Sequence, residues 1–248
     1  MIELYCIKDK VPKKEYEIVD SLINKYKINQ DVVVALGGDG TFLDALKRYD
    51  KPVLLIGKST SLAFHADNKV NDLEDCLEKL IEGEFKVEEV NKLDVYLNKK
   101  NIGVCVNDYY AKTGKTIDYE IDFHYDKFRA RGDGFIVFTP FGSSGYNRAV
   151  GGPKIDFRSK VIGISQVATC SLNDPLPYII PEDQPIEIEI KRGIGRLYLD
   201  GEEPIKIKEG DKIYSELSDK KGKIIRINPK TISKRLFQRQ LEFYQRLE

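Results

Sequence analysis

The chain has 248 residues, enough for one large domain or for two modest domains that bury a sizeable core. Its 40 basic and 40 acidic side chains balance, which gives no indication of a nucleic-acid partner or of a membrane surface. The N-terminal residues are too polar for a signal peptide and no apolar run is long enough to span a bilayer, so we expect a cytoplasmic protein.

The four cysteines lie far apart in the sequence and form no Cys-x-x-Cys pair. With two histidines besides, this spacing argues against a zinc site and favours reduced thiols. The charged fraction of 32%, mostly glutamate and lysine, is typical of a thermophilic source.

The first third of the chain alternates short apolar runs with segments of helical periodicity. We predict strands and helices in turn over residues 2–7, 13–26, 31–36, 41–49, 52–57 and 70–82. This order predicts a parallel sheet with helices on both faces, which places ligands at the carboxyl ends of the strands.

The stretch Gly37-Gly38-Asp39-Gly40-Thr41 joins the second predicted strand to the helix that follows. Glycines let backbone N–H groups approach an anion closely, and a helix N-terminus adds partial positive charge. The candidate phosphate-binding residues are therefore Gly37, Gly38, Gly40 and Thr41. Asp39 would repel a phosphate unless it binds a metal or takes a proton, so the pattern indicates phosphoryl transfer. The alternative is a tight turn with a capping aspartate.

From about Val87 the pattern changes to short alternating strands with almost no helical periodicity. This change predicts a second, mostly β domain. Within it, residues 93–97 and 102–106 flank a turn at residues 98–101 and predict a hairpin.

We therefore expect an α/β domain over residues 1–92, a β-rich domain over residues 93–230 and a C-terminal helix over residues 231–248. The last segment carries an apolar stripe at helical spacing between residues 233 and 247. We expect this helix to bury the stripe by packing back on the first domain.

A second motif runs from residue 131 to residue 153, within the predicted β domain. There a strand over residues 135–138 leads into Thr-Pro-Phe-Gly-Ser-Ser-Gly-Tyr, a loop of small and hydroxylated residues that ends at Tyr146. Such a loop brings backbone amides and hydroxyls to a polar ligand, and the tyrosine ring offers a surface for stacking. Alone it would be read as a connection, but its occurrence beside the turn at Asp39 favours a binding role.

Together these motifs resemble the NAD kinase family, over nearly the whole chain. The family pairs a GGDGT turn with an Asn-Glu or Asn-Asp pair, a DGxxxxTPTGSTAYxxxxGGP segment and a later Asp-Gly. The matching stretches here are residues 37–41, Asn107-Asp108, residues 133–153 (DGFIVFTPFGSSGYNRAVGGP) and Asp200-Gly201. The resemblance implies an N-terminal α/β domain, a C-terminal β domain and assembly as a homodimer or homotetramer.

The resemblance also implies phosphorylation of the 2′-hydroxyl on the adenosine ribose of NAD, giving NADP. ATP would be the phosphoryl donor, with Mg²⁺ or Mn²⁺ carried by ATP and no direct protein ligand to the metal. The sequence does not exclude polyphosphate as the donor or NADH as the acceptor. Because phosphoryl transfer has a loose transition state, positioning and charge neutralisation should contribute more than basicity.

Residue by residue, the resemblance makes Asp39 the catalytic aspartate. The dinucleotide-binding residues that it implies are Gly40, Leu43, Phe64, Asn107, Asp108, Asp133, Ser144, Gly145 and Tyr146. Among these, Asn107 and Asp108 would hold the ribose and the adenine, and Asp133 would reach a nicotinamide-side site from a neighbouring subunit. Further candidates are Arg131, Ala149, Ala168 and Asp200.

The chain departs from the family pattern in two loops. Residues 58–65 read Lys-Ser-Thr-Ser-Leu-Ala-Phe-His and lack both glycines of the family loop, while Phe141 replaces a small residue and Gly145 an alanine. These departures bear on substrate preference and leave Asp39 untouched.

Two other functions stay open. A GGDGT-type kinase for another hydroxyl acceptor, such as a lipid, would need a hydrophobic acceptor pocket or a membrane-facing patch, which the evenly charged chain does not indicate. A non-catalytic NAD(P)-binding sensor would bind NADP without turnover, and the presence of Asp39 argues against it.

Overall fold

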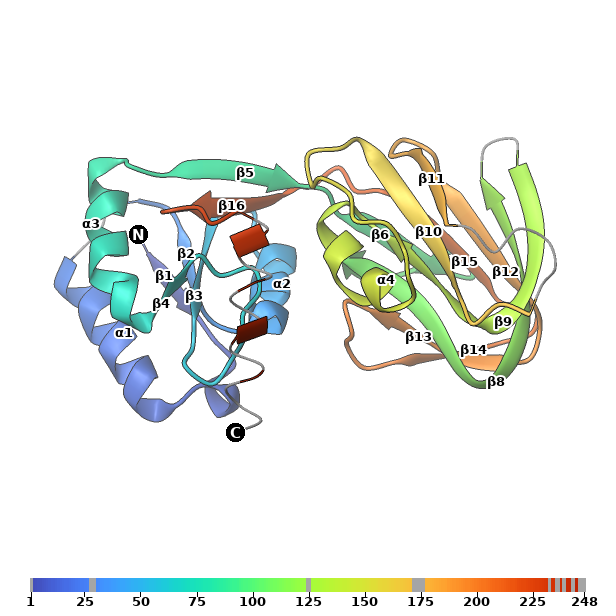
Figure 1. Cartoon of the computed structure of the whole chain (residues 1–248), viewed down its shortest axis with the longest axis horizontal. Coiled ribbons are helices and arrows are strands. Elements are labelled where there is room, and N and C mark those ends of the chain that lie inside the picture. The colour runs from blue at the N-terminus through green and yellow to red at the C-terminus, as the bar shows by residue number, and fades with distance from the viewer. Residues whose placement is uncertain are drawn as a thin grey trace. The chain divides into compact units, whose positions relative to one another are not determined.

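The computed structural model describes residues 2–26, 30–123, 126–170, 177–231, 233–234, 237, 240–241 and 244. The chain forms two compact units, the first made of residues 1–89 and 222–248 and the second of residues 90–221 (Figure 1). The chain thus leaves the first unit after Glu89 and returns to it at Gly222.

The first unit is built on a sheet of the order β1-β2-β3-β16-β5, with β4 beside β3. The strands are β1 (Glu3–Tyr5), β2 (Val33–Gly37), β3 (Val53–Gly57), β4 (Asn68–Lys69), β5 (Lys86–Val90) and β16 (Gly222–Arg226). Parallel pairing joins β1 to β2, and joins β3 to β2, β4 and β16. Every residue of β2 and β3 is buried, which is why both strands read as unbroken apolar runs.

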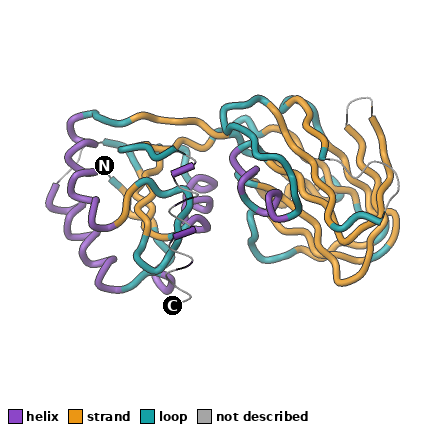
Figure 2. Tube along the Cα trace, viewed as in Figure 1, coloured by secondary structure: helices purple, strands orange, loops and turns teal. Residues whose placement is uncertain are grey.

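Helices cover both faces of this sheet (Figure 2). On one face, α1 (Lys13–Tyr26) and α3 (Leu73–Glu82) share a buried cluster with alternate side chains of the strands. That cluster includes Val19, Val34, Leu36, Leu54, Leu77 and Ile225. On the other face lies α2 (Asp39–Arg48), whose Phe42 and Leu46 are fully buried. The predicted doubly covered parallel sheet is confirmed.

The second unit is mostly β, as predicted. Its described strands form a sheet of the order β11-β10-β9-β8-β12-β15-β6-β7, with β13 beside β8 and β14 beside β13. They are β6 (Leu93–Leu97), β7 (Lys100–Cys105), β8 (Asp108–Phe123), β9 (Asp126–Phe138), β10 (Val161–Val167), β11 (Tyr178–Pro181), β12 (Ile186–Arg192), β13 (Ile194–Leu199), β14 (Ile205–Lys208) and β15 (Lys212–Leu217). The short helices η3 (Phe141–Ser144) and α4 (Tyr146–Ala149) follow β9.

The long strand β8 pairs with different strands along its length, and the sheet therefore curves around one core. Residues 109–112 pair with β13, whereas residues 118–123 pair with β12. Between them the register against β9 shifts, from Lys112 to Ile117. The enclosed core contains Tyr109, Tyr119, Phe135, Ile188 and Leu197.

The predicted hairpin over residues 93–106 is confirmed by the antiparallel pairing of β6 with β7. At its turn Asn98 and Lys99 have positive φ values of 51° and 68°. Two successive positive φ values are the mark of a type I′ turn, whose twist matches that of the flanking strands.

Two expectations about the end of the chain need correction. Residues 222–226, assigned above to the β-rich domain, form β16 in the sheet of the first unit, where Ile224 is opposite Val53. Their local alternation does not distinguish the two sheets, since only long-range pairing decides between them. The stripe of the C-terminal segment is also exposed where described, at 61% for Phe237 and 59% for Tyr244.

The described residues of that C-terminal segment are helical at positions 233–234, 237, 240–241 and 244, and the segment belongs to the first unit. The rest of the expected helix lies outside the described residues. Within the described part of the chain, no helix has the length and apolar character needed to cross a membrane.

Candidate functional site

Asp39 is the first residue of α2 and is separated from the end of β2 by Gly38 alone. Its Oδ2 accepts a hydrogen bond from the backbone N–H of Phe64, and its Oδ1 accepts one from that of His65, both at 2.9 Å. Two successive amides therefore hold the carboxylate in one orientation. Each oxygen keeps a lone pair with which to accept a further donor.

The glycines around Asp39 differ in the space that surrounds them. A Cβ on Gly37 would lie 2.5 Å from Oγ1 of Thr41, and a Cβ on Gly38 would lie 2.5 Å from Oγ of Ser61. These two glycines thus permit close packing of the turn, and Thr41 is buried at 6% exposure. Gly40 is exposed, and a Cβ there would meet no atom within 4 Å. Of the predicted phosphate-binding residues, Gly37 and Thr41 are therefore inside the unit, and Gly40 faces outward.

The N-terminus of α2 keeps the features expected of an anion site. Gly38 occupies the N-cap position in an extended conformation, and no side chain of the described residues makes a capping hydrogen bond there. Helix N-termini leave backbone N–H groups without intrahelical partners, and the helix dipole favours negative charge at this end. Leu43 and Phe64, both predicted dinucleotide contacts, are 5% and 7% exposed and take part in the packing of the first unit.

In the second unit, Asn107 and Asp108 are held by the carboxylate of Asp200. Its Oδ2 accepts the N–H of Val106 at 2.9 Å, while Oδ1 accepts those of Asn107 at 2.8 Å and Asp108 at 3.2 Å. The N–H of Asp200 donates in return to the carbonyl of Asp108 at 2.9 Å. Asp200, a further candidate from the sequence, therefore shapes the backbone of the pair.

The turn around Asp200 explains how it reaches that position. Asp200 and Gly201 have positive φ values of 49° and 75°, and the N–H of Glu202 donates to the carbonyl of Leu199 at 3.0 Å. This is the geometry of the Asp-Gly turn that joins β13 to β14. An Asp-Gly pair between two runs of alternating apolar residues predicts such a hairpin turn. This pattern is the sequence signal for the position of Asp200.

Asp108 is buried and Asn107 is half-buried, with the Oδ1 atom of Asn107 itself buried. Oδ1 of Asn107 has no hydrogen-bond partner among the described residues. Asp108 is 4% exposed, and burial, together with the nearby charge of Asp200, raises the pKa of its carboxyl to about 7. A buried acceptor without a partner and a buried carboxyl beside a second carboxylate are costly unless a further group engages them.

The glycine-serine loop closes over this pair. A Cβ on Gly142 would lie 2.0 Å from the backbone O of Asn107, so the two backbones touch. A Cβ on Gly145 would lie 3.6 Å from Oδ2 of Asp108. Gly145 and Asp108 are therefore brought together, although residues 37 positions apart carry no local signal for this contact. Thr139 strengthens the arrangement by donating from Oγ1 to the carbonyl of Val106 at 2.6 Å.

Tyr146 begins α4 and is half-buried in a cluster of tyrosine rings. Its ring lies edge-on to Tyr110, with centroids 4.7 Å apart, and Tyr110 stacks on Tyr198 at 4.8 Å. Asn147 braces the loop from inside by donating from Nδ2 to the carbonyl of Pro153 at 2.8 Å. Ser144 is half-buried, whereas Ala149 and Ala168 are exposed.

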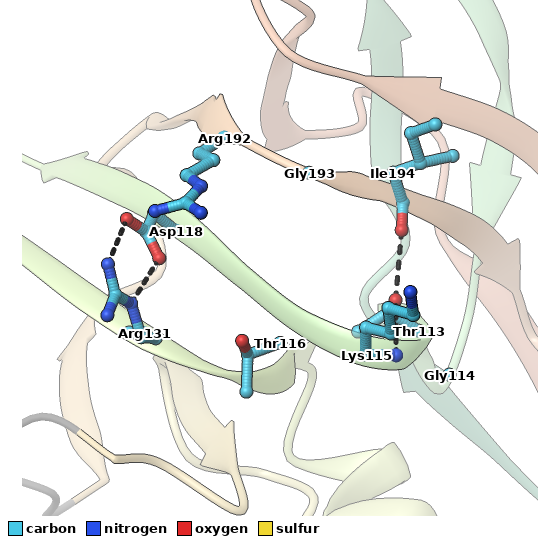
Figure 3. Close-up of a pocket in the computed structure, with 9 residues that line it drawn as sticks. All are labelled: Thr113, Gly114, Lys115, Thr116, Asp118, Arg131, Arg192, Gly193 and Ile194. Carbon is cyan, nitrogen blue, oxygen red and sulfur yellow. Dashed lines mark hydrogen bonds and ion pairs between the residues drawn. The ribbon is translucent and has the colours of Figure 1, made fainter.

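Arg131 lies on β9 and lines a cavity of about 600 Å³ in the second unit (Figure 3). Its Nε donates to Oδ1 of Asp118 at 2.6 Å, and its Nη2 donates to Oδ2 at 2.9 Å. The guanidinium lowers the pKa of the Asp118 carboxyl below its usual value through these hydrogen bonds. Arg131 is thus paired with a carboxylate of the same unit. Asp133, two residues further along β9, is half-buried.

No group of three or more His, Cys, Asp or Glu side chains in the described part of the chain is arranged to hold a metal ion. His65 is the position that sequence reasoning left without a role. Its backbone N–H reaches Asp39, a contact that no residue pattern reveals.

Both parts of the chain have counterparts among known proteins. Residues 2–85 match the family described as the ATP-NAD kinase N-terminal domain, and residues 86–227 match the ATP-NAD kinase C-terminal domain. An NAD kinase of Thermoplasma volcanium is 32% identical over 206 residues, covering 80% of this chain and 75% of that protein. An NAD kinase of Campylobacter jejuni is 31% identical over 243 residues, covering 91% and 82%.

Two solved structures share the fold. An NAD kinase from Archaeoglobus fulgidus in complex with ATP superposes with a TM-score of 0.80 at 21% identity, covering 97% of this chain and 99% of that one. A yeast NADH kinase complexed with NADH gives a TM-score of 0.74 at 24% identity, covering 90% of this chain and 66% of that one.

Proposed function

Because this chain belongs to the NAD kinase family, we propose that it transfers the terminal phosphoryl group of ATP to the 2′-hydroxyl of the adenosine ribose of NAD, which yields NADP. The observation that carries this proposal is the carboxylate of Asp39, oriented by two backbone amides at the N-terminus of α2. A carboxylate so fixed is suited to one defined acceptor hydroxyl.

Asp39 accepts a hydrogen bond from the ribose hydroxyl and takes its proton late in the transfer. A general base of this kind contributes about 10²–10⁴-fold to the rate. Because the transition state is loose, the larger part of this effect comes from aligning the hydroxyl oxygen with the phosphorus atom. The exposed Gly40 lets the terminal phosphate approach the backbone N–H groups at the start of α2.

Asn107 and Asp108 bind the adenosine part of the dinucleotide. The amide of Asn107 offers an acceptor that has no partner among the described residues, and Asp108 offers a buried carboxyl. Ribose hydroxyls and the adenine amine need such acceptors. Ser144, Gly145 and Tyr146 line the same region of the second unit and complete the dinucleotide contacts.

The donor and the assembly are parts of the same proposal. Mg²⁺ or Mn²⁺ carried by ATP would supply positive charge that offsets the charge of the phosphates, and no side chain of this chain is assigned to it. Polyphosphate is the alternative donor. The active form is a homodimer or homotetramer in which Asp133 serves the nicotinamide side of a neighbouring copy, as the family resemblance implies.

Turnover by the purified protein tests the proposal. NAD, Mg²⁺ and either ATP or polyphosphate are supplied, and NADP is read out with an NADP-specific dehydrogenase. We expect NADP from the wild type and a loss of about 10²–10⁴-fold in kcat for Asp39→Asn, with NADP binding retained. Asp44→Asn is the matched control, because Asp44 lies on the same helix but bonds to Tyr5 and Arg48.

The assay also separates the alternatives. Binding of NADP without turnover by the wild type would identify a sensor. Absence of dinucleotide binding would redirect the search to another hydroxyl acceptor. Equal turnover by wild type and Asp39→Asn would refute the role of Asp39 while leaving the family assignment intact.

A further inference from the structure

Arg226 is the centre of a buried ionic cluster in the first unit. Its side chain is 5% exposed, and its Nη1 lies 3.1 Å from Oδ2 of Asp67, which is 3% exposed. Its Nε lies 2.8 Å from Oε2 of Glu88. Arg226 ends β16 and Glu88 lies in β5, the two strands through which the chain returns to and leaves this unit. The cluster therefore joins the returning strand to the outgoing one.

The same guanidinium reaches the loop that holds Asp39. Nη1 of Arg226 donates to the backbone O of His65 at 3.0 Å. The N–H of this same His65 donates to Oδ1 of Asp39 at 2.9 Å. The backbone of His65 thus makes both contacts: its N–H donates to Asp39 and its C=O accepts from Arg226.

Two further hydrogen bonds fasten the residues after His65 to the segment that follows β16. The N–H of Lys230 donates to Oδ1 of Asp67 at 2.9 Å, and Nδ2 of Asn68 donates to the carbonyl of Ile227 at 3.0 Å. The loop that contains His65 is therefore held at two places. Asp39 of α2 binds its backbone amides, and β16 with the segment after it binds its carbonyl and the residues that follow.

Stability is a poor explanation for this cluster. Burying charged groups costs a desolvation penalty that their mutual attraction often fails to offset, so apolar packing could replace such a cluster at little cost. A guanidinium instead supplies several donors in a rigid planar fork, and this geometry suits it to fixing the positions of several acceptors together. Arg226 contacts two carboxylates and one backbone carbonyl in this way.

We propose that Arg226 is a positioning residue for phosphoryl transfer: by holding the His65 carbonyl, it fixes the amides that orient the Asp39 carboxylate. This inference rests on the proposed function of Asp39. Arg226 acts through His65 and touches no reacting atom. Because a misplacement of about 1 Å can cost about 10²-fold in rate, removal of Arg226 lowers kcat about 10- to 100-fold. The affinity for dinucleotide, which depends on other residues, stays as it is.

The test compares three variants with the wild type. Arg226→Lys keeps the charge but replaces the planar fork by one ammonium nitrogen. Arg226→Met combined with Asp67→Asn removes the guanidinium without leaving the Asp67 carboxylate buried and unpaired. Arg158→Met is the matched control, because Arg158 is an exposed arginine that pairs with Asp156. kcat and KM for NAD are measured separately, and kcat is expressed per NADP-binding site found by titration.

We expect kcat per site to fall about 10- to 100-fold in the double variant, with KM for NAD within about twofold of wild type. We expect the kcat per site of Arg226→Lys to lie between those of the double variant and the wild type. The kcat per site of Arg158→Met should equal that of the wild type. Wild-type kcat per site in the double variant, even with a lowered melting temperature, would overturn the proposal, as would a loss carried by KM alone.

Amide hydrogen exchange of Phe64 and His65 tests the inference without turnover. Faster exchange of these two amides in the double variant than in the wild type supports the positioning role, and unchanged exchange overturns it. This measurement separates the two proposals, because a wild type that forms no NADP refutes the function while the exchange result still decides the role of Arg226.

Discussion

Asp108 and Asp200 are neighbouring carboxyls with opposite surroundings. Asp200 accepts three backbone N–H groups, from Val106, Asn107 and Asp108 itself. Burial, together with repulsion from the charge of Asp200, raises the pKa of Asp108 to about 7. One aspartate thus shapes the backbone, and the other is the carboxyl that we propose binds the dinucleotide.

The raised pKa of Asp108 predicts a pH-dependent affinity for dinucleotide. Above about pH 7 the carboxyl is ionised and accepts hydrogen bonds from ribose hydroxyls, whereas below it the proton removes one acceptor. We therefore expect KM for NAD to rise as the pH falls through 7. The Asp108→Asn variant should have a raised KM that no longer changes over this range, and a wild-type pH profile in the variant would contradict the assignment.

The same group makes a prediction for stability. The folded pKa of about 7 lies above the ordinary value of 3.8, so the folded state binds more protons than the unfolded state between these values. The free energy of unfolding due to Asp108 therefore falls as the pH rises, by about 1.4 kcal/mol per pH unit within this window. Urea unfolding at pH 5 and pH 8 measures it, and Asp108→Asn should remove this part of the difference.

Asp200→Asn tests the brace under Asn107 and Asp108. One carboxylate oxygen becomes a donor, so at least one backbone N–H loses its acceptor and the pair shifts. We expect KM for NAD to rise about 10-fold, since a lost hydrogen bond to a charged group is worth roughly 1.5–3 kcal/mol. Asp211→Asn is the control, because Asp211 braces another turn by accepting the N–H of Lys208. Equal effects of the two changes on KM would argue against a specific role.

Gly142→Ala tests the contact between the glycine-serine loop and Asn107. The new Cβ would lie 2.0 Å from the Asn107 carbonyl oxygen, so one backbone must move. We expect loss of NADP binding, measured by calorimetry, together with a lower melting temperature. Gly114→Ala, where a Cβ meets nothing within 4 Å, should leave both unchanged.

Gly40→Ala tests the approach of the donor to α2. A Cβ at Gly40 meets no atom of the protein within 4 Å, so the fold should be retained. If the terminal phosphate comes close to this backbone, the methyl group should raise KM for ATP about 10-fold, equivalent to about 1.4 kcal/mol. Unchanged KM and kcat for ATP would show that the donor does not approach the helix at Gly40.

Much of the local structure could be predicted from the sequence. The helix expected over residues 13–26 has those bounds, and the hairpin over residues 93–106 forms as expected. Both depend on periodicity and turn residues within short segments, which act locally. The strand at residues 222–226 could not be assigned to its sheet, because its partner Val53 lies far away in the sequence.

By itself, the sequence determined the family, the two kinds of domain and the motif residues Asp39, Asn107 and Asp108, because these are written in short patterns and local propensities. Only the tertiary structure decided what these residues touch. Asp39 meets an amide 26 positions away, and the carbonyl of that same residue meets Arg226 across 161 positions. Such contacts depend on how distant strands and loops pack, and burial, not composition, raises the pKa of Asp108.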